Sequence, residues 1–99
     1  MTTRISEEGL VTGELCHRFE RDHCLLTGSG TTALFAALQA LRLPLGTPVL
    51  YPDLTCETAA NAAVFADLKP VFCDIDPRTG NLDLTRVRSR VIETGAKVV

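Results

Sequence analysis

Residues 23–34 read HCLLTGSGTTAL, and this stretch decides how the rest of the chain is interpreted. A short apolar run leads into a turn of small residues, and an apolar helical segment follows. The pattern predicts a strand over residues 24–27 and a helix that starts just after Ser29. Gly28 and Gly30 would let the backbone turn sharply there and come close to a ligand.

Two interpretations of this turn are open on the residues alone. Thr31 and Thr32 place hydroxyls and backbone N–H groups at a helix start, where the helix dipole favours an anion such as phosphate. Alternatively, Ser29 or Thr31 simply caps the helix. The spacing fits neither a P-loop, because no Gly-Lys-Ser/Thr follows, nor a G-x-G-x-x-G dinucleotide turn, because Ala33 takes the third glycine's place.

Size and composition indicate one small globular domain that forms an apolar core. The chain has 99 residues, of which 45% are hydrophobic, and a formal net charge of −2. This charge gives no electrostatic reason to expect nucleic acid or an anionic membrane as a partner. No apolar run approaches the roughly 18 residues of a membrane span. The first eight residues lack the apolar core of a signal peptide, so we expect a cytoplasmic protein.

The four cysteines are widely spaced and lie in apolar segments, where a free thiol behaves as a small hydrophobe. Disulfides are not expected in the cytosol. A zinc site is conceivable among two cysteines and two histidines, but their spacing matches no usual ligand pattern, so we expect no metal. The cysteines are Cys16, Cys24, Cys56 and Cys73, and the zinc candidates are Cys16, His17, His23 and Cys24.

Apolar periodicity predicts four helices alternating with four short strands, the pattern of a parallel sheet covered by helices on both faces. The expected helices are residues 8–21, residues 31–43, one ending near Ala66 and one capped by Asp83. The expected strands are residues 24–27, 49–51, 69–73 and 97–99.

Several side chains of these helices have expected positions. The first helix should carry an apolar stripe and an outward Glu14–Arg18 pair. The helix over 31–43 is apolar on nearly every side and should be buried on more than one. Asp53 or Thr55 should cap the third helix. The stripe is Val11, Leu15 and Phe19; in the fourth helix, Leu84, Val87 and Val91 should face inward and Arg86, Arg90 and Glu93 outward.

Three turns should converge on one edge of the sheet. In a parallel α/β sheet, the segments that follow the strands all lie at the carboxyl edge, where such sheets bind ligands. Residues 27–32, 52–56 and 74–77 each follow a predicted strand. We therefore expect a ligand site built from these three segments.

The chain is expected to be a partial domain spanning residues 1–99. Three or four short strands make a thin core. An apolar strand at the last residues would leave an unpaired edge, so the chain looks cut short. Residues 1–7 are expected to be a frayed lead-in.

Three motifs in order give the chain a resemblance to a known family. They are GSGTTAL at residues 28–34, PVLYPDLTCETAANA at 48–62 and KPVFCDID at 69–76. The chain resembles the DegT/DnrJ/StrS family over residues 15–99. Its members are pyridoxal-phosphate-dependent sugar aminotransferases of the aspartate-aminotransferase-like architecture (fold type I). The resemblance implies that this α/β chain is part of the large domain, and it covers only the N-terminal part of a family member.

The resemblance also implies roles for five residues. Ser29, Gly30 and Thr31 match the family's turn that holds the phosphate of pyridoxal 5'-phosphate, and Thr32 takes the next position. Cys56 stands where the family usually has an aromatic ring stacked on the cofactor, a departure that offers less contact area. Simple packing at a helix start is the alternative role for Cys56.

The catalytic residues of the family have no counterpart in this sequence. Transaldimination needs a lysine that forms a Schiff base and an acid that keeps the pyridine nitrogen protonated. In the family both lie downstream of Val99. Lys69 and Lys97 are expected at the amino edge of the sheet, so no residue is assigned as catalytic.

The resemblance implies that the full-length protein moves an amino group from glutamate to a keto sugar nucleotide, as a homodimer. The alternative from another class is a non-catalytic α/β remnant that binds a phosphate ligand or a partner protein.

Overall fold

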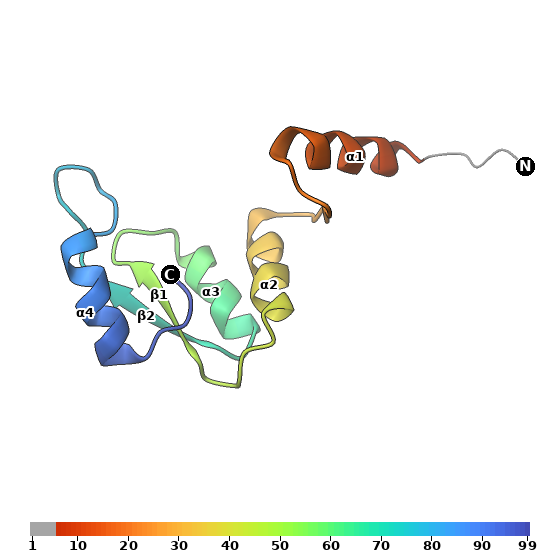
Figure 1. Ribbon diagram of the computed structural model, residues 1–99. Coiled ribbons are helices and arrows are strands. Elements are labelled where there is room, and N and C mark those ends of the chain that lie inside the picture. Colours follow the sequence, from red (N-terminus) through yellow and green to blue (C-terminus); the bar gives the residue numbers. More distant parts are fainter. Residues whose placement is uncertain (1–5) are drawn as a thin grey trace, which may run out of the picture.

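A computed structural model describes residues 6–99 of the chain, so most of the predicted lead-in lies outside the described residues. Four helices and two strands alternate in part along the chain, and β1 and β2 pair in parallel (Figure 1). The elements are α1 (Glu7–Phe19), α2 (Gly30–Ala40), β1 (Pro48–Pro52), α3 (Glu57–Phe65), β2 (Lys69–Cys73) and α4 (Leu84–Thr94). The predicted α/β class with a parallel sheet is confirmed.

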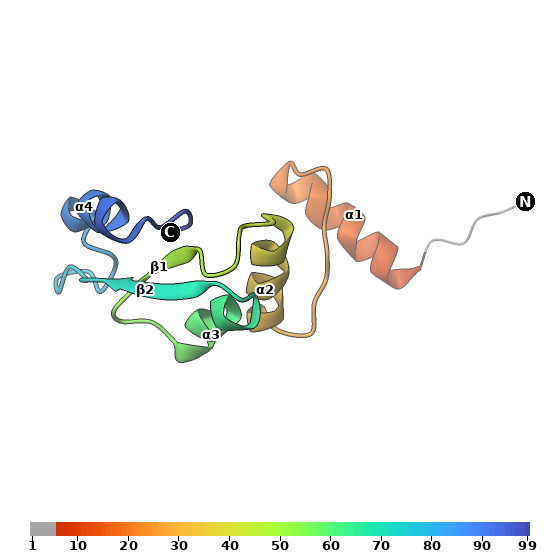
Figure 2. The same cartoon turned by 90° about the horizontal axis from the view of Figure 1, so that it is seen from below.

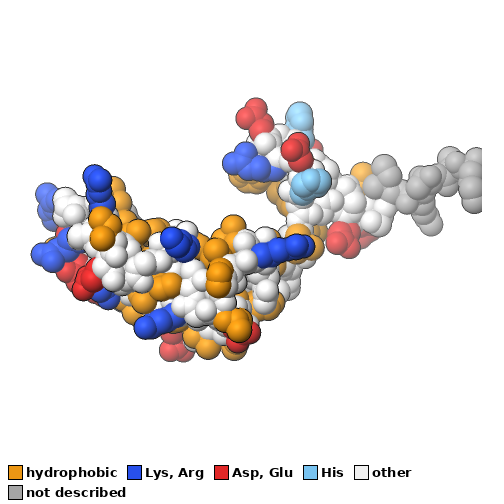
Figure 3. Space-filling view, turned by 60° about the horizontal axis from the view of Figure 1, so that its bottom comes forward, with side chains coloured by type: hydrophobic (Ala, Val, Ile, Leu, Met, Phe, Trp, Pro, Cys, Tyr) orange, Lys and Arg blue, Asp and Glu red, His pale blue; other side chains and the backbone are white. Residues whose placement is uncertain are grey.

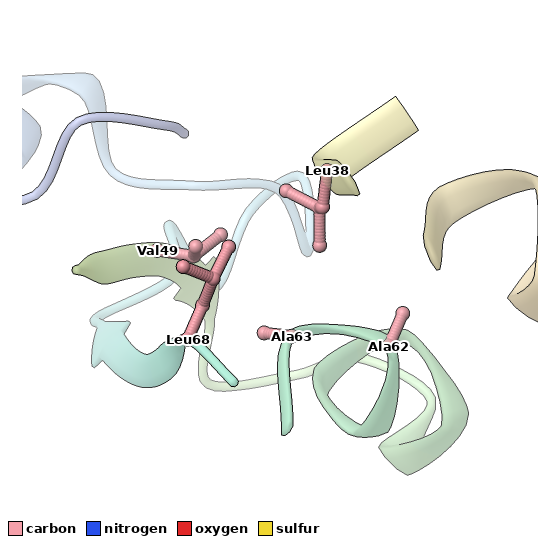
Figure 4. Packing of buried hydrophobic residues seen from close by; sticks show 5 residues of the cluster. All are labelled: Leu38, Val49, Ala62, Ala63 and Leu68. Atoms are coloured by element: carbon pink, nitrogen blue, oxygen red, sulfur yellow. The ribbon is translucent and has the colours of Figure 1, made fainter. Parts of the chain in front are cut away.

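The sheet lies between helices. Seen along its edge in Figure 2, α4 lies over one face and α3 over the other. On the α3 side, Val49 of β1 packs against Leu38 of α2 and the small side chains of α3, as Figure 4 shows. Alanines at the contact let α3 approach closely, since they add no bulk there. This cluster contains Leu38, Val49, Ala62, Ala63 and Leu68.

A second core lies on the α4 side of the sheet. Leu50 packs with Cys73 and Ala96, and Val87 and Val91 of α4 close over them. Because successive side chains of a strand point to opposite faces, Val49 and Leu50 serve the two cores separately. Both are only 2% exposed, so β1 is the buried centre of the molecule.

The predicted fourth strand forms a single parallel bridge beside β1. Val98 pairs with Val49. The backbone N–H of Leu50 donates to the Val98 carbonyl at 2.8 Å, and that of Lys97 donates to Pro48 at 3.1 Å. β1 therefore has a backbone partner on each side. Among the described residues, β2 has a strand partner on one side, which is β1.

Two predicted boundaries are wrong. Residues 24–27 are not a strand, because no ladder partner for them lies within the described residues, and Leu25 is 73% exposed. The second helix stops at Ala40 rather than residue 43. Arg42 takes a left-handed conformation (φ 50°), and Pro44 disfavours helical geometry in the residue before it.

Burial is also less than predicted. Only Leu38 of α2 is buried, because α3 covers one side of that helix and leaves Leu34 and Leu41 exposed. The expected stripe on α1 exists, but Val11 and Phe19 are exposed and no residue of α1 is buried. Figure 3 shows apolar side chains spread over the surface of the body and α1 standing apart from it.

Helix ends decide several smaller predictions. The Asp83 cap is confirmed, since its carboxylate accepts the Thr85 N–H at 3.0 Å. The prediction for α3 is wrong: Cys56 is its N-cap, without a side-chain cap bond. Leu84 is 80% exposed rather than inward, because it is the first residue of α4.

Contacts on the surface of α1 and α4 give a mixed result. The Glu14–Arg18 pair forms as predicted, with 3.0 Å between Arg18 Nε and Glu14 Oε1. Arg90 does not point outward: it is partly buried and its Nε donates to the Phe72 carbonyl at 2.7 Å.

The chain exposes far more surface than a closed domain of its size. Its accessible area is 7754 Å², against about 5,500 Å² for a typical monomer of this mass. The radius of gyration is 17.0 Å, against about 13 Å for a compact chain of 100 residues. The helices α1, α2 and α3 contribute exposed apolar side chains to this surface.

Replacing Leu50 by alanine should lower the free energy of unfolding by about 2–5 kcal/mol, because it leaves a cavity in the second core. Urea unfolding followed by circular dichroism measures the loss. Leu84→Ala is the matched control and should change the free energy by less than about 0.5 kcal/mol. Equal losses in the two variants would contradict the central position of β1.

Candidate functional site

The turn at residues 28–32 is built around the Ser29 side chain. Ser29 is the N-cap of α2, and its Oγ accepts the Thr32 backbone N–H at 3.1 Å. The same oxygen lies 2.9 Å from Thr32 Oγ1. Thr27 Oγ1 donates to the Ser29 carbonyl at 2.8 Å, which fixes the entry into the turn. Three hydroxyl side chains therefore hold one rigid helix start.

Two backbone donors remain open at this helix start. Within the described residues, the N–H groups of Gly30 and Thr31 have no protein acceptor. No acidic residue lies in the first turn of α2, and the dipole adds partial positive charge there. Ser29 caps the helix, so the capping interpretation is correct. It does not exclude anion binding at the same helix start. Capping uses one donor and leaves two for an anion.

Of the two roles expected for the glycines, the sharp turn is not observed. Neither Gly28 nor Gly30 has a positive φ, so the turn itself does not require glycine. A Cβ at either position would meet no atom within 4 Å, so the space above the turn is open. What the glycines provide is access: the two free N–H groups can be approached closely.

A small apolar pocket adjoins the turn. Thr31 and Thr32 line it together with Phe35 of α2 and Phe65 of α3, and its volume is about 280 Å³. The threonine side chains thus form one wall of a pocket whose other walls are aromatic.

The other two predicted segments meet at the carboxyl edge of the sheet. The Asp53 N–H donates to the Cys73 carbonyl at 2.9 Å, which joins the end of β1 to the end of β2. Asp74 follows directly and pairs with Arg86 at 3.3 Å. In Figure 1, α3 begins after the loop that leaves the end of β1. No hydrogen bond among the described residues joins the Ser29 turn to these two segments, so its place in a common site with them stays a prediction.

Cys56 is exposed at the start of α3. Its Sγ lies 3.1 Å from Thr58 Oγ1, and this hydrogen bond lowers the pKa of the thiol. No hydrogen bond among the described residues joins it to the Ser29 turn. By contrast, burial raises the pKa of Cys73. Cys56 is thus an exposed thiol with a lowered pKa at the start of α3, and its contact with a cofactor stays a prediction.

Both lysines lie at the opposite end of the strands from the turns. Lys69 is the first residue of β2 and pairs with Pro48. The backbone of Lys97 bonds to the carbonyl of the same Pro48. Their backbones therefore have the amino-edge position that the sequence predicts.

Residues 6–99 contain no group of three or more side chains able to hold a metal ion. Three of the four zinc candidates, Cys16, His23 and Cys24, line one pocket of about 240 Å³ near the end of α1. Proximity alone does not give them a ligand geometry.

Sequence reasoning missed one pocket, of about 370 Å³, between α4 and the carboxyl ends of the strands. Asp53, Asp74, Arg86, Arg90 and Glu93 are among its lining residues. Its charges are largely paired internally: Arg86 with Asp74, and Arg90 with Glu93 at 3.0 Å. The sequence pattern could not indicate this pocket, because it depends on contacts between residues far apart in the chain. Arg90, for example, bonds to Phe72, eighteen residues earlier.

The model of the DegT/DnrJ/EryC1/StrS aminotransferase family matches residues 7–99. The chain belongs to this family. The motifs at residues 28–34, 48–62 and 69–76 thus indicate the right family, and the match reaches back to the first residues of α1.

Two aminotransferases and a synthase are among the curated relatives of the chain. A dTDP-4-dehydro-2,3,6-trideoxy-D-glucose 4-aminotransferase of Saccharopolyspora spinosa is 41% identical over 78 residues, 79% of this chain and 20% of that protein. An L-glutamine:2-deoxy-scyllo-inosose aminotransferase of Streptomyces lividus is 36% identical over 77 residues, 78% of this chain and 18% of that protein. A GDP-perosamine synthase of Caulobacter vibrioides is 38% identical over 69 residues, 70% and 19% of the two chains. The chain spans about a fifth of the length of these relatives.

A solved structure shares the fold. It is the E coli GDP-4-keto-6-deoxy-D-mannose-3-dehydratase with bound hydrated PLP, with a TM-score of 0.76 and 23% sequence identity. The match covers 86% of this chain and 23% of the dehydratase. The α/β arrangement is therefore part of the fold type I architecture, as the resemblance implied. None of the helices within residues 6–99 has the length and apolarity needed to cross a bilayer.

Alkylation of Cys56 by iodoacetamide should follow its thiolate fraction. The rate should rise with pH and level off above the lowered pKa, at a lower pH than for an ordinary cysteine. Thr58→Ala removes the hydrogen bond, raises the pKa and should slow alkylation at pH 7. Rates are measured by mass spectrometry in a Cys16→Ser/Cys24→Ser background.

Thr58→Ser keeps a hydroxyl and is the matched control, expected to alkylate like the parent. The same midpoint in the alanine and serine variants would show that the hydroxyl does not set the thiol's pKa.

Proposed function

We propose that this chain is the N-terminal part of a pyridoxal-phosphate-dependent aminotransferase that acts on a keto sugar nucleotide, and that residues 29–32 hold the cofactor phosphate. The observation that carries the proposal is the pair of free N–H groups on Gly30 and Thr31, beside three hydroxyls and under open space. A helix start alone is common. Here it coincides with the family's Ser-Gly-Thr turn.

The residues present suit a phosphate group. A bound phosphate accepts several hydrogen bonds, and a nearby carboxylate would repel it. Gly30 and Thr31 offer backbone donors, and the hydroxyls of Ser29, Thr31 and Thr32 can turn to donate. The first turn of α2 has no acid that would repel an anion.

When bound, pyridoxal phosphate supplies an electron sink for reactions at the substrate's amino-bearing carbon. The part of this chain is to bind and orient. The Ser29 turn fixes the phosphate end. The Cys56 thiol lies at the position of the family's stacking aromatic, where it would touch less of the ring. We therefore expect weaker cofactor affinity than an aromatic residue would give.

The reacting groups of the enzyme are proposed to lie outside this chain. Lys69 and Lys97 start their strands, away from the Ser29 turn. The lysine that binds the cofactor covalently and the acid beside the pyridine nitrogen would therefore come from the downstream part of the protein. The name of the Saccharopolyspora relative supports a keto sugar nucleotide as substrate. The name of the Streptomyces lividus relative gives L-glutamine as the amino donor, and glutamate as the donor here rests on the family resemblance.

The surface supports a larger assembly. The exposed apolar sides of α1, α2 and α3 need cover from other polypeptide, which we propose comes from the rest of the chain and from a second copy in a cytoplasmic homodimer. Among the described residues no helix could span a membrane, and the net charge of −2 gives no electrostatic reason to expect nucleic acid as a partner.

A non-catalytic remnant is the second candidate. The same phosphate turn without a covalent lysine would bind a phosphate ligand or a partner protein. Cys56 in place of an aromatic favours this candidate, because it weakens the cofactor's ring contact. Binding of inorganic phosphate as tight as binding of pyridoxal phosphate would identify the remnant.

The 99-residue chain should bind pyridoxal phosphate saturably and pyridoxal at least tenfold more weakly, because the turn recognises the phosphate. Ser29→Glu should abolish the difference by placing a negative charge at the helix start. Equilibrium dialysis measures both ligands, in a Lys69→Arg/Lys97→Arg background that prevents nonspecific imines.

Ser89→Glu, an exposed substitution on α4, is the control and should leave both affinities unchanged. Equal binding of pyridoxal and pyridoxal phosphate to the unsubstituted turn would refute the phosphate site.

A further inference from the structure

The outer edge of β2 can be defined from the hydrogen bonds at the two ends of the sheet. The N–H of Lys69 donates to Thr47 at 3.0 Å, and the carbonyl of Cys73 accepts from Asp53 at 2.9 Å. In a parallel ladder, alternate residues of a strand bond to the same neighbour. Lys69, Val71 and Cys73 therefore face β1. The backbone groups of Pro70 and Phe72 face the outer edge.

Most of the groups on that outer edge are absent or already used. Pro70 has no N–H to donate. The Phe72 carbonyl accepts from Arg90 Nε at 2.7 Å, and Glu93 holds the same guanidinium at 3.0 Å. The next outward carbonyl, that of Asp74, accepts from the Asp83 N–H at 3.0 Å. Within β2 itself, an incoming strand would find one donor, the Phe72 N–H, and one acceptor, the Pro70 carbonyl.

The opposite edge of the sheet is in a different state. On the far side of β1, the Pro48 carbonyl and the Leu50 N–H are bonded to the backbone of Lys97 and Val98. These two groups of β1 are thus already used by residues 97 and 98, which run parallel to β1.

We propose that Pro70 and Arg90 close the outer edge of β2 against pairing with a second copy of the chain, so that the sheet extends only on the β1 side, where residues 97 and 98 already lie. Closure matters because β2 reads KPVFC, a short apolar strand with Phe72 40% exposed. Unpaired apolar edges of this kind are templates for edge-to-edge aggregation, and proline and cationic side chains are common ways to block them. This inference does not depend on the proposed function.

The proposal is tested with substitutions that expose the backbone hydrogen-bonding groups on the outer edge of β2. Pro70→Val restores an outward N–H, and Arg90→Ala frees the Phe72 carbonyl. The double variant of the 99-residue chain should show at least a fivefold higher thioflavin T signal and light scattering than the parent at equal concentration. Arg88→Ala removes an exposed arginine from the same helix and should match the parent.

Amide hydrogen exchange in the parent protein measures directly whether the outer edge of β2 is paired. The Phe72 amide should exchange rapidly at every protein concentration, whereas the amides of Val71 and Cys73 are protected by β1. Protection of Phe72 that grows with concentration would overturn the proposal, because it would show strand addition at β2.

The double variant gives the second decisive result. If it keeps the parent's circular dichroism and associates no more than Arg88→Ala, the edge is not closed by these residues. If the double variant loses its structure, the test uses the single variant Pro70→Val instead. This variant keeps Arg90 and is expected to associate more than Arg88→Ala; equal association would overturn the proposal.

Discussion

The parallel pairing of β1 with β2 is the constraint on which the rest of the structure depends. Five registered pairs, from Pro48 with Lys69 to Pro52 with Cys73, set the two strands side by side. Val49 and Leu50 then face opposite sides, and each gathers one of the two apolar cores. The pairing also brings the segments after both strands to one edge. The position of α3, and through it of α2 and its Ser29 turn, follows from packing on this sheet.

The parts of the fold that could be predicted from sequence are those set by local pattern. The strand over residues 69–73 has its predicted bounds because its apolar run ends at charged and turn-forming residues. Asp83 was recognisable as a cap because a carboxylate before a helix satisfies a free N–H. The Ser29 turn was recognisable because hydroxyl residues and glycines precede an apolar helix.

The failures share a physical cause, which is dependence on distant partners. Residues 24–27 have strand-like composition, but a strand exists only when another segment supplies its hydrogen bonds. The buried sides expected for α2 require a neighbour that residues 6–99 do not supply. Arg90 was expected outward because sequence periodicity cannot show a carbonyl eighteen residues away. The amino-edge position of Lys69 was predictable, since it begins a strand.

We propose that the Ser29 turn is one half of a cofactor site, because its free N–H groups can hold a phosphate. The chain around it exposes apolar faces on α1, α2 and α3. The most direct measurement is the amide NMR spectrum of the chain during titration with pyridoxal phosphate. The account predicts saturable shifts centred on the amides of Gly30, Thr31 and Thr32, which inorganic phosphate at high concentration reverses. Shifts centred on Lys69 and Lys97, with the turn unaffected, would contradict it.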